Sequence, residues 1–472
     1  MIDQHHPSPR PFRIVIVGAG LVGLSLSHAL QLANIDHVVL EKHDKIVSIH
    51  GAALMIYPAV ARIFDQFGIL ESIHKSITPI QRETERWPDG SVSMRGKNLR
   101  VLSEKFDMPV ILFDRQRCVT HLYDGLPDKS KVRTSARVDR IEHTETGVKV
   151  YLTDGTFEEG DIVIGADGVH SRVRQVMWDY AAEHEPDTIP DSDKQALFTE
   201  YKGLFGVSDH KGLDLGPADV NIIMGQDTTE LVFTQPGIVY WAVVYKDEYS
   251  QPPTPFRLNQ TEQDAVAARF KDIKLGPNLT FQDVYQAKTR SGILNIEEGI
   301  LSQWHVGRMV LVGDSAHKMT ADIGIGANMA IESAVTLCNV LQAHLSQHPR
   351  DYHPTPSQVS ALFANYQAQR FVRAKTFMTL SGKVTRMRSF QSAWKRFFIM
   401  YIATTRWMQR VQSEGLIEGL AQGPKLNYAP TRTINVDAEG WKMEPKRTPW
   451  VVYVLLTSAV AVGATYFISS RL

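Results

Sequence analysis

The chain has 472 residues, of which 43% are hydrophobic and 22% charged, an ordinary composition for about two or three structural units with real cores. Its 51 basic and 51 acidic side chains cancel, which argues against a general nucleic-acid-binding protein. The two cysteines, Cys118 and Cys338, lie far apart. A disulfide scaffold or a metal site is therefore not expected, and a reducing compartment fits. The polar N-terminus, residues 1–11, has no apolar stretch typical of a cleaved signal peptide.

The first folding unit of the sequence is typical of nucleotide-binding proteins. Residues 13–17 predict a buried parallel strand, residues 21–32 a helix, and residues 36–41 a second strand. Glycines join the first strand directly to the helix. This β-α-β unit can therefore present the N-terminus of its helix to a bound phosphate.

Gly18, Gly20 and Gly23 form the pattern G-x-G-x-x-G at this turn. Glycine permits the tight turn, the approach of a pyrophosphate to the backbone, and the close packing of helix against strand. Glu41 ends the second strand, where a carboxylate can bind ribose hydroxyls. An acid there favours FAD or NAD over NADP, whose ribose carries a phosphate. A glycine-rich turn without a ligand is the alternative, and the flanking strand, helix and acid argue against it.

The middle of the sequence predicts further strands. Residues 132–152 alternate as in a β-hairpin, and residues 161–164 and 309–312 are short apolar strands that run into turns containing Gly and Asp. Between these two strands, residues 196–246 carry several β-rich runs. We expect this stretch to form a substrate-side sheet inserted between the nucleotide-binding segments.

A second motif, Gly-Ala-Asp-Gly, occupies residues 165–168 at the end of a predicted strand. The turn can bring backbone groups and the Asp167 carboxylate to a nucleotide. Arg172 and Arg174 in the following helix could bind its phosphates. The alternative is an ordinary strand–turn–helix in which Asp167 caps the helix.

A third motif, Gly-Asp-Ser-Ala-His, contains Asp314 and His317 and precedes the glycine-rich segment 324–328. The Asp314 carboxylate suits the hydroxyls of a ribityl chain. The glycine-rich segment, which includes Gly326, opens a helix whose N–H groups can face the O2/N1 edge of a flavin ring. That helix end would stabilise the negative charge of the reduced ring. A lone histidine is usually structural, so no acid–base role is predicted for His317.

Helices follow the third motif, over residues 326–345 and 359–412. The second stretch holds ten Lys or Arg residues, many aromatic residues, and no Asp or Glu. Such a stretch could lie on a membrane surface, or it could be a basic face packed on the acidic remainder of the protein. The sequence favours neither strongly. Residues 423–449 resemble a linker.

The last segment of the chain is apolar. Residues 450–470 contain no charged side chain, and about 20 such residues can cross ~30 Å of hydrocarbon as a helix. Lys446 and Arg447 precede the segment, and Trp450 and Tyr453 could lie at the headgroup level. We expect a single-pass C-terminal membrane anchor with the catalytic domain in the cytosol. The alternative is a buried C-terminal helix.

The three motifs, in this order and spacing, resemble the class A flavoprotein monooxygenases, the family of para-hydroxybenzoate hydroxylase, over residues 12–345. The resemblance implies an α/β fold, with a Rossmann-like FAD-binding domain and an inserted β-sheet substrate domain. It implies FAD as cofactor and NAD(P)H as a transient co-substrate, and no metal. The expected units are an FAD-binding domain at 12–195 and 291–345, a substrate-side sheet at 196–290, basic helices at 358–422, a linker at 423–449, and a transmembrane helix at 450–470.

A narrower resemblance is to the membrane-anchored FAD-dependent epoxidases of fungal indole-diterpene and meroterpenoid pathways. It rests on residues 201–208 and 317–320 and on the apolar C-terminus. Gly51 in Gly-Ala-Ala and Arg115 in Phe-Asp-Arg-Gln-Arg look like the positions of this family that lie near the flavin. The FAD contacts that the resemblance implies are Glu41, Gly51, Arg115, Asp314 and Ala327.

The reaction that the resemblance implies is epoxidation of a prenyl or terpenoid olefin in secondary metabolism. The olefin would attack the distal oxygen of a C4a-hydroperoxyflavin, so the protein supplies orientation and a dry pocket and needs no general base. Tyr201, Tyr240 and Trp241 are candidates for the pocket, with roles as core aromatics as the alternative. The lipophilic substrate would concentrate in the membrane, and a downstream terpene cyclase could be a partner. The chain departs from the branch at Ala321, usually proline, and at Ile325, often polar.

Three other functions fit the sequence less well. An aromatic hydroxylase on the same scaffold would need a group that favours a phenolate, and none is evident in the sequence. A flavin reductase or desaturase would not transfer oxygen to its substrate. A tethered nucleotide-binding scaffold would not be an enzyme.

Overall fold

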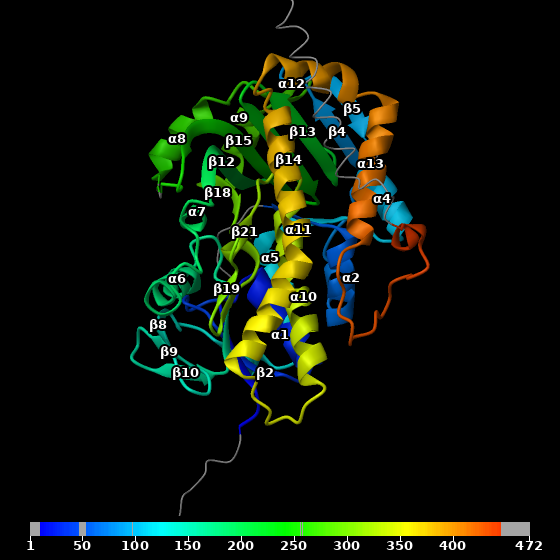
Figure 1. The fold of residues 1–472 in the computed structure, drawn as a ribbon. Helices are drawn as coiled ribbons and strands as arrows, with labels where there is room; N and C mark the ends of the chain where they lie inside the picture. The colour runs from blue at the N-terminus through cyan, green and yellow to red at the C-terminus, as the bar shows by residue number, and fades with distance from the viewer. Residues whose placement is uncertain (1–9, 47–52, 97, 255, 257, 445–472) are drawn as a thin grey trace, which may run out of the picture.

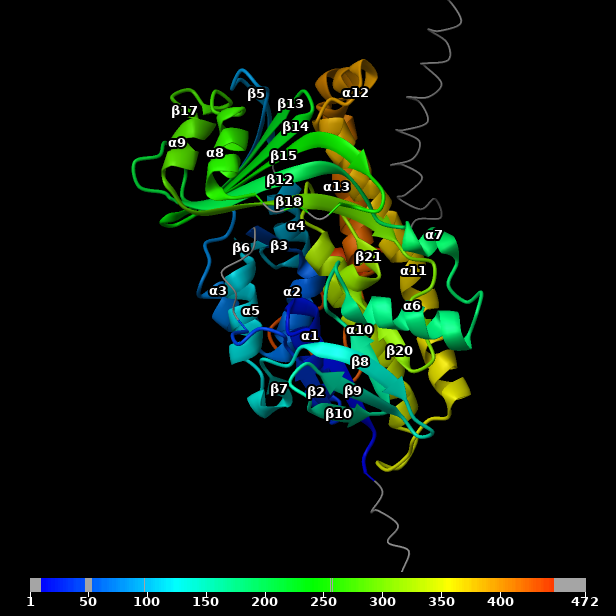
Figure 2. The same ribbon diagram turned by 90° about the vertical axis from the view of Figure 1, so that its left-hand side faces the viewer.

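Two large β-sheets organise the chain, which the computed structural model describes over residues 10–46, 53–96, 98–254, 256 and 258–444. Figures 1 and 2 show the smaller sheet near the N-terminal end of the described chain and the larger sheet at the opposite end of the molecule. The long helix α11, Pro356–Arg388, contacts strands of both sheets. Segments far apart in sequence are therefore held together in one frame.

The smaller sheet has six strands in the order β19-β20-β11-β1-β2-β7. Neighbouring strands from β20 to β7 are parallel, and β19 pairs antiparallel with β20 at one edge. The central strands are buried on both faces, which explains their continuous runs of Val and Ile. The expected β-α-β unit and the two later apolar strands are confirmed. The six strands span Arg13–Val17 (β1), Asp36–Leu40 (β2), Val132–Arg133 (β7), Ile162–Gly165 (β11), His305–Val306 (β19) and Met309–Leu311 (β20).

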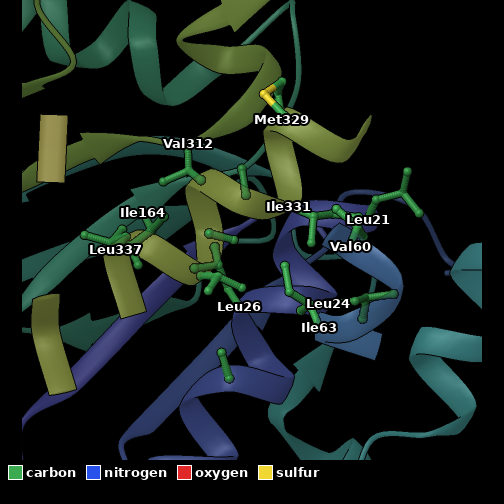
Figure 3. Packing of buried hydrophobic residues seen from close by; sticks show 14 of the residues in the cluster. Leu21, Leu24, Leu26, Val60, Ile63, Ile164, Val312, Met329, Ile331 and Leu337 are labelled. Carbon is green, nitrogen blue, oxygen red and sulfur yellow. The ribbon is translucent and has the colours of Figure 1, made fainter. Parts of the chain in front are cut away.

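Helices α1, α2 and α10 pack their apolar sides together beside this sheet. Figure 3 shows Leu24 of α1, Ile63 of α2 and Ile331 of α10 in the shared core. Full burial of one such side chain contributes about 1.5–3 kcal/mol, so this core holds α1 and α10 in place beside the sheet. The helices span Leu21–Leu32 (α1), Pro58–Phe67 (α2) and Gly326–Leu345 (α10).

Two small antiparallel sheets flank the six-stranded sheet. The hairpin expected at residues 132–152 begins only at residue 138, because residues 132–133 pair with β2 of the six-stranded sheet instead. Its strands and their neighbour are Val138–His143 (β8), Val148–Leu152 (β9) and Phe157–Gly160 (β10). A two-stranded sheet joins Ala53–Ile56 (β3) to Ile111–Asp114 (β6), which leads into helix α5, Arg115–Asp124.

The larger sheet has eight strands in the order β21-β18-β12-β15-β14-β13-β4-β5. Helices α8 and α9 contact strand β12, on the side of the sheet that Figure 2 shows away from α1. The sheet is not confined to residues 196–290, because β18 crosses residue 290 and two strands come from residues 82–96. The strands span Arg82–Arg86 (β4), Val92–Gly96 (β5), Phe198–Asp209 (β12), Asp219–Gly225 (β13), Thr228–Gln235 (β14), Ile238–Ser250 (β15), Lys288–Ile300 (β18) and His317–Lys318 (β21). The connecting elements include Leu70–His74 (α3), Asn98–Phe106 (α4), Arg172–His184 (α6), Asp191–Lys194 (α7), Gln260–Ala268 (α8) and Phe281–Gln286 (α9).

The basic stretch at residues 359–412 forms nearly all of α11, all of α12 (Ala393–Phe398) and the first part of α13 (Arg406–Ala421). Several of its arginines form ion pairs with acidic side chains of other elements. These pairs are Arg370 and Arg373 with Glu332, Arg386 with Glu200 and Glu298, and Arg388 with Glu85. Of the two interpretations left open above, the structure thus supports a basic face packed on the acidic remainder of the protein.

The segment expected as a linker packs along helix α2 over residues 423–444. Leu426 is buried, and its carbonyl oxygen accepts a hydrogen bond of 2.9 Å from Gln66 Nε2. The Asp65 carboxylate accepts hydrogen bonds from the backbone N–H groups of Arg432 and Thr433. Residues 423–444, called the strap below, are therefore a packed segment of the fold and not a free linker.

The expected membrane localisation is corrected by the structure. Among the residues that it describes, none of the helices combines the length and the apolar character needed to cross a bilayer. The segment 450–470, predicted above as the anchor, lies outside the described residues.

Glu230 in β14 is expected to make folding stability depend on pH. Its side chain is 1% exposed, no ion pair to it occurs within the described residues, and burial raises its pKa from 4.5 to about 7. The protonated form is favoured in the folded state, so the contribution of Glu230 to stability is fully present below pH 4.5 and is lost as pH rises through 7. The loss approaches about 3 kcal/mol. We expect Glu230→Gln to remove this slope and to be more stable than the wild type at pH 8 in urea unfolding. An equal slope in Glu230→Gln would contradict the assignment.

Candidate active site

A cavity of about 700 Å³ lies where β1, β2, β11 and β20 end. The carboxyl edge of a parallel sheet is the place where α/β proteins bind nucleotides. Most of the cofactor-binding residues predicted from sequence line this cavity, although they come from distant parts of the chain. They are Gly18, Gly20, Glu41, Arg115, Asp167, Asp314, Gly326 and Ala327. Gly23 does not line the cavity, and Gly51 lies outside the described residues.

The turn after β1 has the shape that a pyrophosphate needs. Gly18 has a φ of +102°, and a Cβ atom there would lie 2.7 Å from the carbonyl oxygen of Ala166. A Cβ atom at Gly23 would lie 1.8 Å from the carbonyl oxygen of Gly18. The N-cap residue of α1, Gly20, offers no side-chain cap, so the first N–H groups of α1 are available to an anion. The cavity and the uncapped helix end fit the pyrophosphate of FAD.

The Glu41 carboxylate is held in place by backbone groups. Its Oε2 accepts a hydrogen bond of 2.9 Å from Ala19 N, and its Oε1 accepts one of 3.0 Å from His43 N. Both donors fix the direction of the side chain at the cavity wall. Each oxygen keeps a lone pair for a hydroxyl donor, as recognition of a ribose requires.

We expect Glu41→Ala to weaken FAD binding by about 10- to 100-fold, because hydrogen bonds to a charged group contribute about 1.5–3 kcal/mol. Quenching of flavin fluorescence on titration of the apoprotein with FAD would measure the change. Glu158→Ala is the control, since Glu158 pairs with Arg13 and Arg133 away from the cavity. Equal FAD affinities in the two variants would contradict the role of Glu41.

Asp314 lies in a turn that a hydrogen bond to strand β11 holds in place. Ser315 Oγ donates a hydrogen bond of 2.7 Å to the carbonyl oxygen of Gly165, so the turn is tied to β11. Lys318, which sequence analysis did not single out, forms an ion pair with the Asp314 carboxylate. Burial would raise the pKa of Asp314, but Lys318 and Arg115 hold it below its ordinary value. The carboxylate is therefore ionised at neutral pH and can accept hydrogen bonds from a polyhydroxyl chain.

The second motif is arranged differently from the expectation. Asp167 accepts hydrogen bonds from Ser171 Oγ and from the N–H groups of Arg172 and Val173, at 2.6, 2.7 and 3.1 Å. Its carboxylate thus holds the start of α6, as in the capping alternative, while Asp167 also lines the cavity. We predicted phosphate contacts for Arg172 and Arg174. Arg172 lines the cavity, so its phosphate contact stays a prediction, whereas Arg174 does not line it. Within the described residues, the two guanidinium groups donate hydrogen bonds to backbone carbonyl groups of residues 139, 169 and 315.

The N-terminus of α10 separates the cofactor cavity from a second cavity. Gly326 and Ala327 line the first, whereas Gly324 and Ile325 line the second. The side-chain amide of Asn328 holds this helix end against β3. It donates a hydrogen bond of 2.8 Å to Met55 O and accepts one of 2.9 Å from Tyr57 N. The first N–H groups of α10 have no side-chain cap. They can therefore stabilise negative charge on a bound ring.

The second cavity has a volume of about 320 Å³ and lies between the eight-stranded sheet and helices α11 and α13. Leu54 of β3 lines both cavities, so the two adjoin. Most of the wall of the second cavity consists of apolar side chains from four distant segments. These include Met55, Leu112, Ile222, Leu231, Phe233, Leu380, Met387, Ile399, Met408 and Leu416. These residues could not be predicted from the sequence, because an apolar side chain in a pocket has the same pattern as one in a core.

Only one of the three predicted pocket aromatics lines the second cavity. Trp241 contributes to its wall, and its Nε1 donates a hydrogen bond of 2.8 Å to Ser208 Oγ. Tyr201 is buried away from the cavity, with its hydroxyl 2.9 Å from Ser389 Oγ. Tyr240 is buried as well and does not line it. His317 is structural, as expected, because its Nε2 bonds to Ser333 Oγ at 3.0 Å and burial lowers its pKa to about 3.

Comparisons with known proteins agree with this geometry. The family model described as an FAD binding domain matches residues 12–196 and 235–371. The FAD-dependent monooxygenase ptmM of Penicillium ochrochloron is 36% identical over 395 residues, which cover 83% of this chain and 92% of that protein. The FAD-dependent monooxygenase penM of Penicillium crustosum is 33% identical over 456 residues, covering 95% of this chain and 94% of the relative.

Solved structures show the same fold. A variant of HpxO of Klebsiella pneumoniae complexed with FAD has a TM-score of 0.69 at 21% identity, covering 88% of this chain and 99% of that one. HpxO complexed with FAD and uric acid has a TM-score of 0.68 at the same identity, covering 88% of this chain and 97% of that one. The residues of the first cavity fit FAD, and the relatives cover almost the whole chain. The chain therefore belongs to the FAD-binding-domain family and is an FAD-dependent monooxygenase with a class A-like fold.

Proposed function

We propose that this enzyme uses NAD(P)H and O₂ to epoxidise a prenyl or terpenoid olefin of a secondary-metabolite intermediate. The observation that carries the proposal is the apolar cavity of about 320 Å³ beside the cofactor cavity, with Leu54 in both walls. An olefin carries no proton that must be removed, so such a cavity can serve it without a base. The product epoxide is the kind of group that a downstream terpene cyclase opens.

Each part of the site has a defined task in this proposal. Glu41 and Asp314 hold the ribose and the ribityl chain, and the N–H groups of α10 stabilise negative charge on the ring. When bound and reduced, FAD supplies the activation of O₂, which amino-acid side chains do not provide. The side chains around Leu231 and Met387 exclude water and orient the olefin.

One observation favours an aromatic hydroxylase as a second candidate. Lys383 of α11 lines the apolar cavity, and burial lowers its pKa. An ammonium group in that position could stabilise a phenolate, which aromatic hydroxylation requires. The two candidates differ in product, because hydroxylation of a phenol leaves any prenyl double bond intact.

Incubation of the FAD-loaded enzyme with NADPH or NADH, ¹⁸O₂ and all-trans-farnesol tests the proposal. We expect one ¹⁸O atom per product molecule, in an epoxide or its diol. Consumption of NAD(P)H without label in any product would identify a reductase and overturn the proposal. Parallel incubation with a prenylated phenol would detect a ring hydroxyl, the product of the second candidate.

A further inference from the structure

The apolar cavity beside the cofactor site has a few charged residues in its wall, namely Glu83, Glu85, Asp322, Lys383 and Arg388. Three of them are already engaged with one another. Arg388 forms an ion pair with the Glu85 carboxylate at 3.0 Å and donates a hydrogen bond of 2.9 Å to the backbone carbonyl of Asp322. The Asp322 carboxylate accepts a hydrogen bond of 2.6 Å from Thr385 Oγ1. These contacts hold the wall of the cavity together.

Glu83 differs from these neighbours. It lies in β4, where alternate side chains point to opposite faces of the sheet, and it shares the cavity face with Glu85. Within the described residues its carboxylate forms no ion pair and accepts hydrogen bonds from two backbone N–H groups at the start of α4, those of Leu99, at 3.2 Å, and Asn98. Burial and the charge of Glu85 raise the pKa of Glu83, although the Leu99 amide and Arg388 oppose the shift. A partly buried carboxyl group that is bonded only to two backbone N–H groups keeps acceptor positions for further donors.

Glu83 also has a distinctive place in the cavity. Leu54 marks the boundary with the cofactor cavity, whereas Glu83 and Leu99 line both the apolar cavity and a third hollow of about 500 Å³. That hollow is polar and carries four arginines, Arg82, Arg86, Arg95 and Arg100. Glu83 therefore lies at the boundary between the apolar cavity and the polar third hollow. This boundary is separate from the one between the apolar cavity and the cofactor cavity.

On the basis of the proposed function, we further propose that Glu83 is a positioning residue that accepts a hydrogen bond from a hydroxyl or N–H group of an otherwise apolar substrate. Binding of such a donor gives this partly buried carboxyl group a further hydrogen bond, which binding of a pure hydrocarbon would not provide. A site built in this way discriminates strongly against analogues that lack the donor. The substrate class that follows is a terpenoid with a hydrogen-bond donor in its polar part, and Glu83 directs the apolar part toward Leu54.

Equilibrium binding to the FAD-loaded, full-length enzyme tests this proposal without turnover. The probes are all-trans-farnesol and its methyl ether, which differ in the donor, and the signal is the change in flavin absorbance on binding. We expect the wild type to bind farnesol at least about tenfold more tightly than the ether. Glu83→Leu should erase this preference, and Glu83→Gln, which keeps a neutral acceptor oxygen, should reduce it several-fold.

Thr84→Ser is the matched control, because Thr84 is the next residue of β4 and lines the third hollow but not the apolar cavity. It should keep the wild-type preference. Equal affinities of the wild type for the two probes would overturn the proposal, as would a preference that survives in both Glu83 variants. If Glu83→Leu does not retain FAD, Glu83→Gln decides the outcome alone. Failure of the proposed function would appear separately, as absence of ¹⁸O in products despite selective binding of farnesol.

Discussion

Replacement of Glu332 by glutamine is expected to lower the free energy of unfolding by about 3–5 kcal/mol, the range found when one partner of a buried ion pair is removed. Glu332 of α10 is 0% exposed and accepts hydrogen bonds from Arg370 Nη1 at 3.0 Å and from Arg373 Nε and Nη2 at 2.7 and 2.8 Å. Burial would raise the pKa of Glu332, but Arg373 and Arg370 hold it below its ordinary value. The glutamine variant would leave two guanidinium groups in the interior without a counter-charge.

Urea unfolding followed by far-UV circular dichroism measures this loss. Glu104→Gln is the control, because Glu104 forms an exposed ion pair with Arg100 one helical turn away, and such pairs contribute about 0.5 kcal/mol. If the free energy of unfolding of Glu332→Gln fell by less than about 1 kcal/mol, the ion pairs of Glu332 with Arg370 and Arg373 would not stabilise the fold as proposed. Raising the salt concentration should leave the difference between the variants largely unchanged, since buried pairs are poorly screened.

The Glu332 cluster also links stability to the active site. It fastens α11 to α10, whose N-terminus separates the two cavities. We therefore expect Glu332→Gln to loosen FAD binding as well, although Glu332 does not line the cofactor cavity. Retention of FAD after gel filtration would report this coupling independently of unfolding.

The nucleotide-binding part of the fold could be predicted because its chemistry is recorded in short stretches of sequence. A strand, a glycine turn and a helix follow one another from residue 13 to residue 32, and Glu41 follows the next strand. Asp314 was predicted for the same reason. The residue types in these turns are dictated by close backbone approach and by hydroxyl ligands, so a local pattern suffices.

The substrate side could not be predicted in the same way. Strand β4 reads Arg-Glu-Thr-Glu-Arg and has no apolar residue to indicate a strand, because its side chains pair with charged partners such as Asp219 and Arg388. The strap at residues 423–444 looks like a linker until Asp65 and Gln66 are seen to bind its backbone. Such features depend on partners hundreds of residues away. The guanidinium of Arg174 likewise binds the carbonyl group of Ser315, which only the folded chain brings near it.

The second large effect is expected for Gly23→Ala, which should weaken FAD binding more than 100-fold, a loss above about 2.7 kcal/mol. The added Cβ atom would lie 1.8 Å from the carbonyl oxygen of Gly18. Both partners are backbone, so neither can rotate away, and α1 must shift from the turn that it shares with β1. The first N–H groups of α1 would then no longer face the pyrophosphate.

Absorbance at flavin wavelengths per mole of purified protein measures the outcome for Gly23→Ala, and titration with FAD gives the affinity. Gly155→Ala separates crowding from backbone strain, because Gly155 has a φ of +84° but open space around its Cβ position, in the turn before β10. That control should cost about 1 kcal/mol of stability and keep FAD. If Gly23→Ala purified with full flavin content, the close contact between α1 and its glycine turn would not be what holds the cofactor. The uncapped end of α10 and the carboxylates of Glu41 and Asp314 would then have to provide that affinity by themselves.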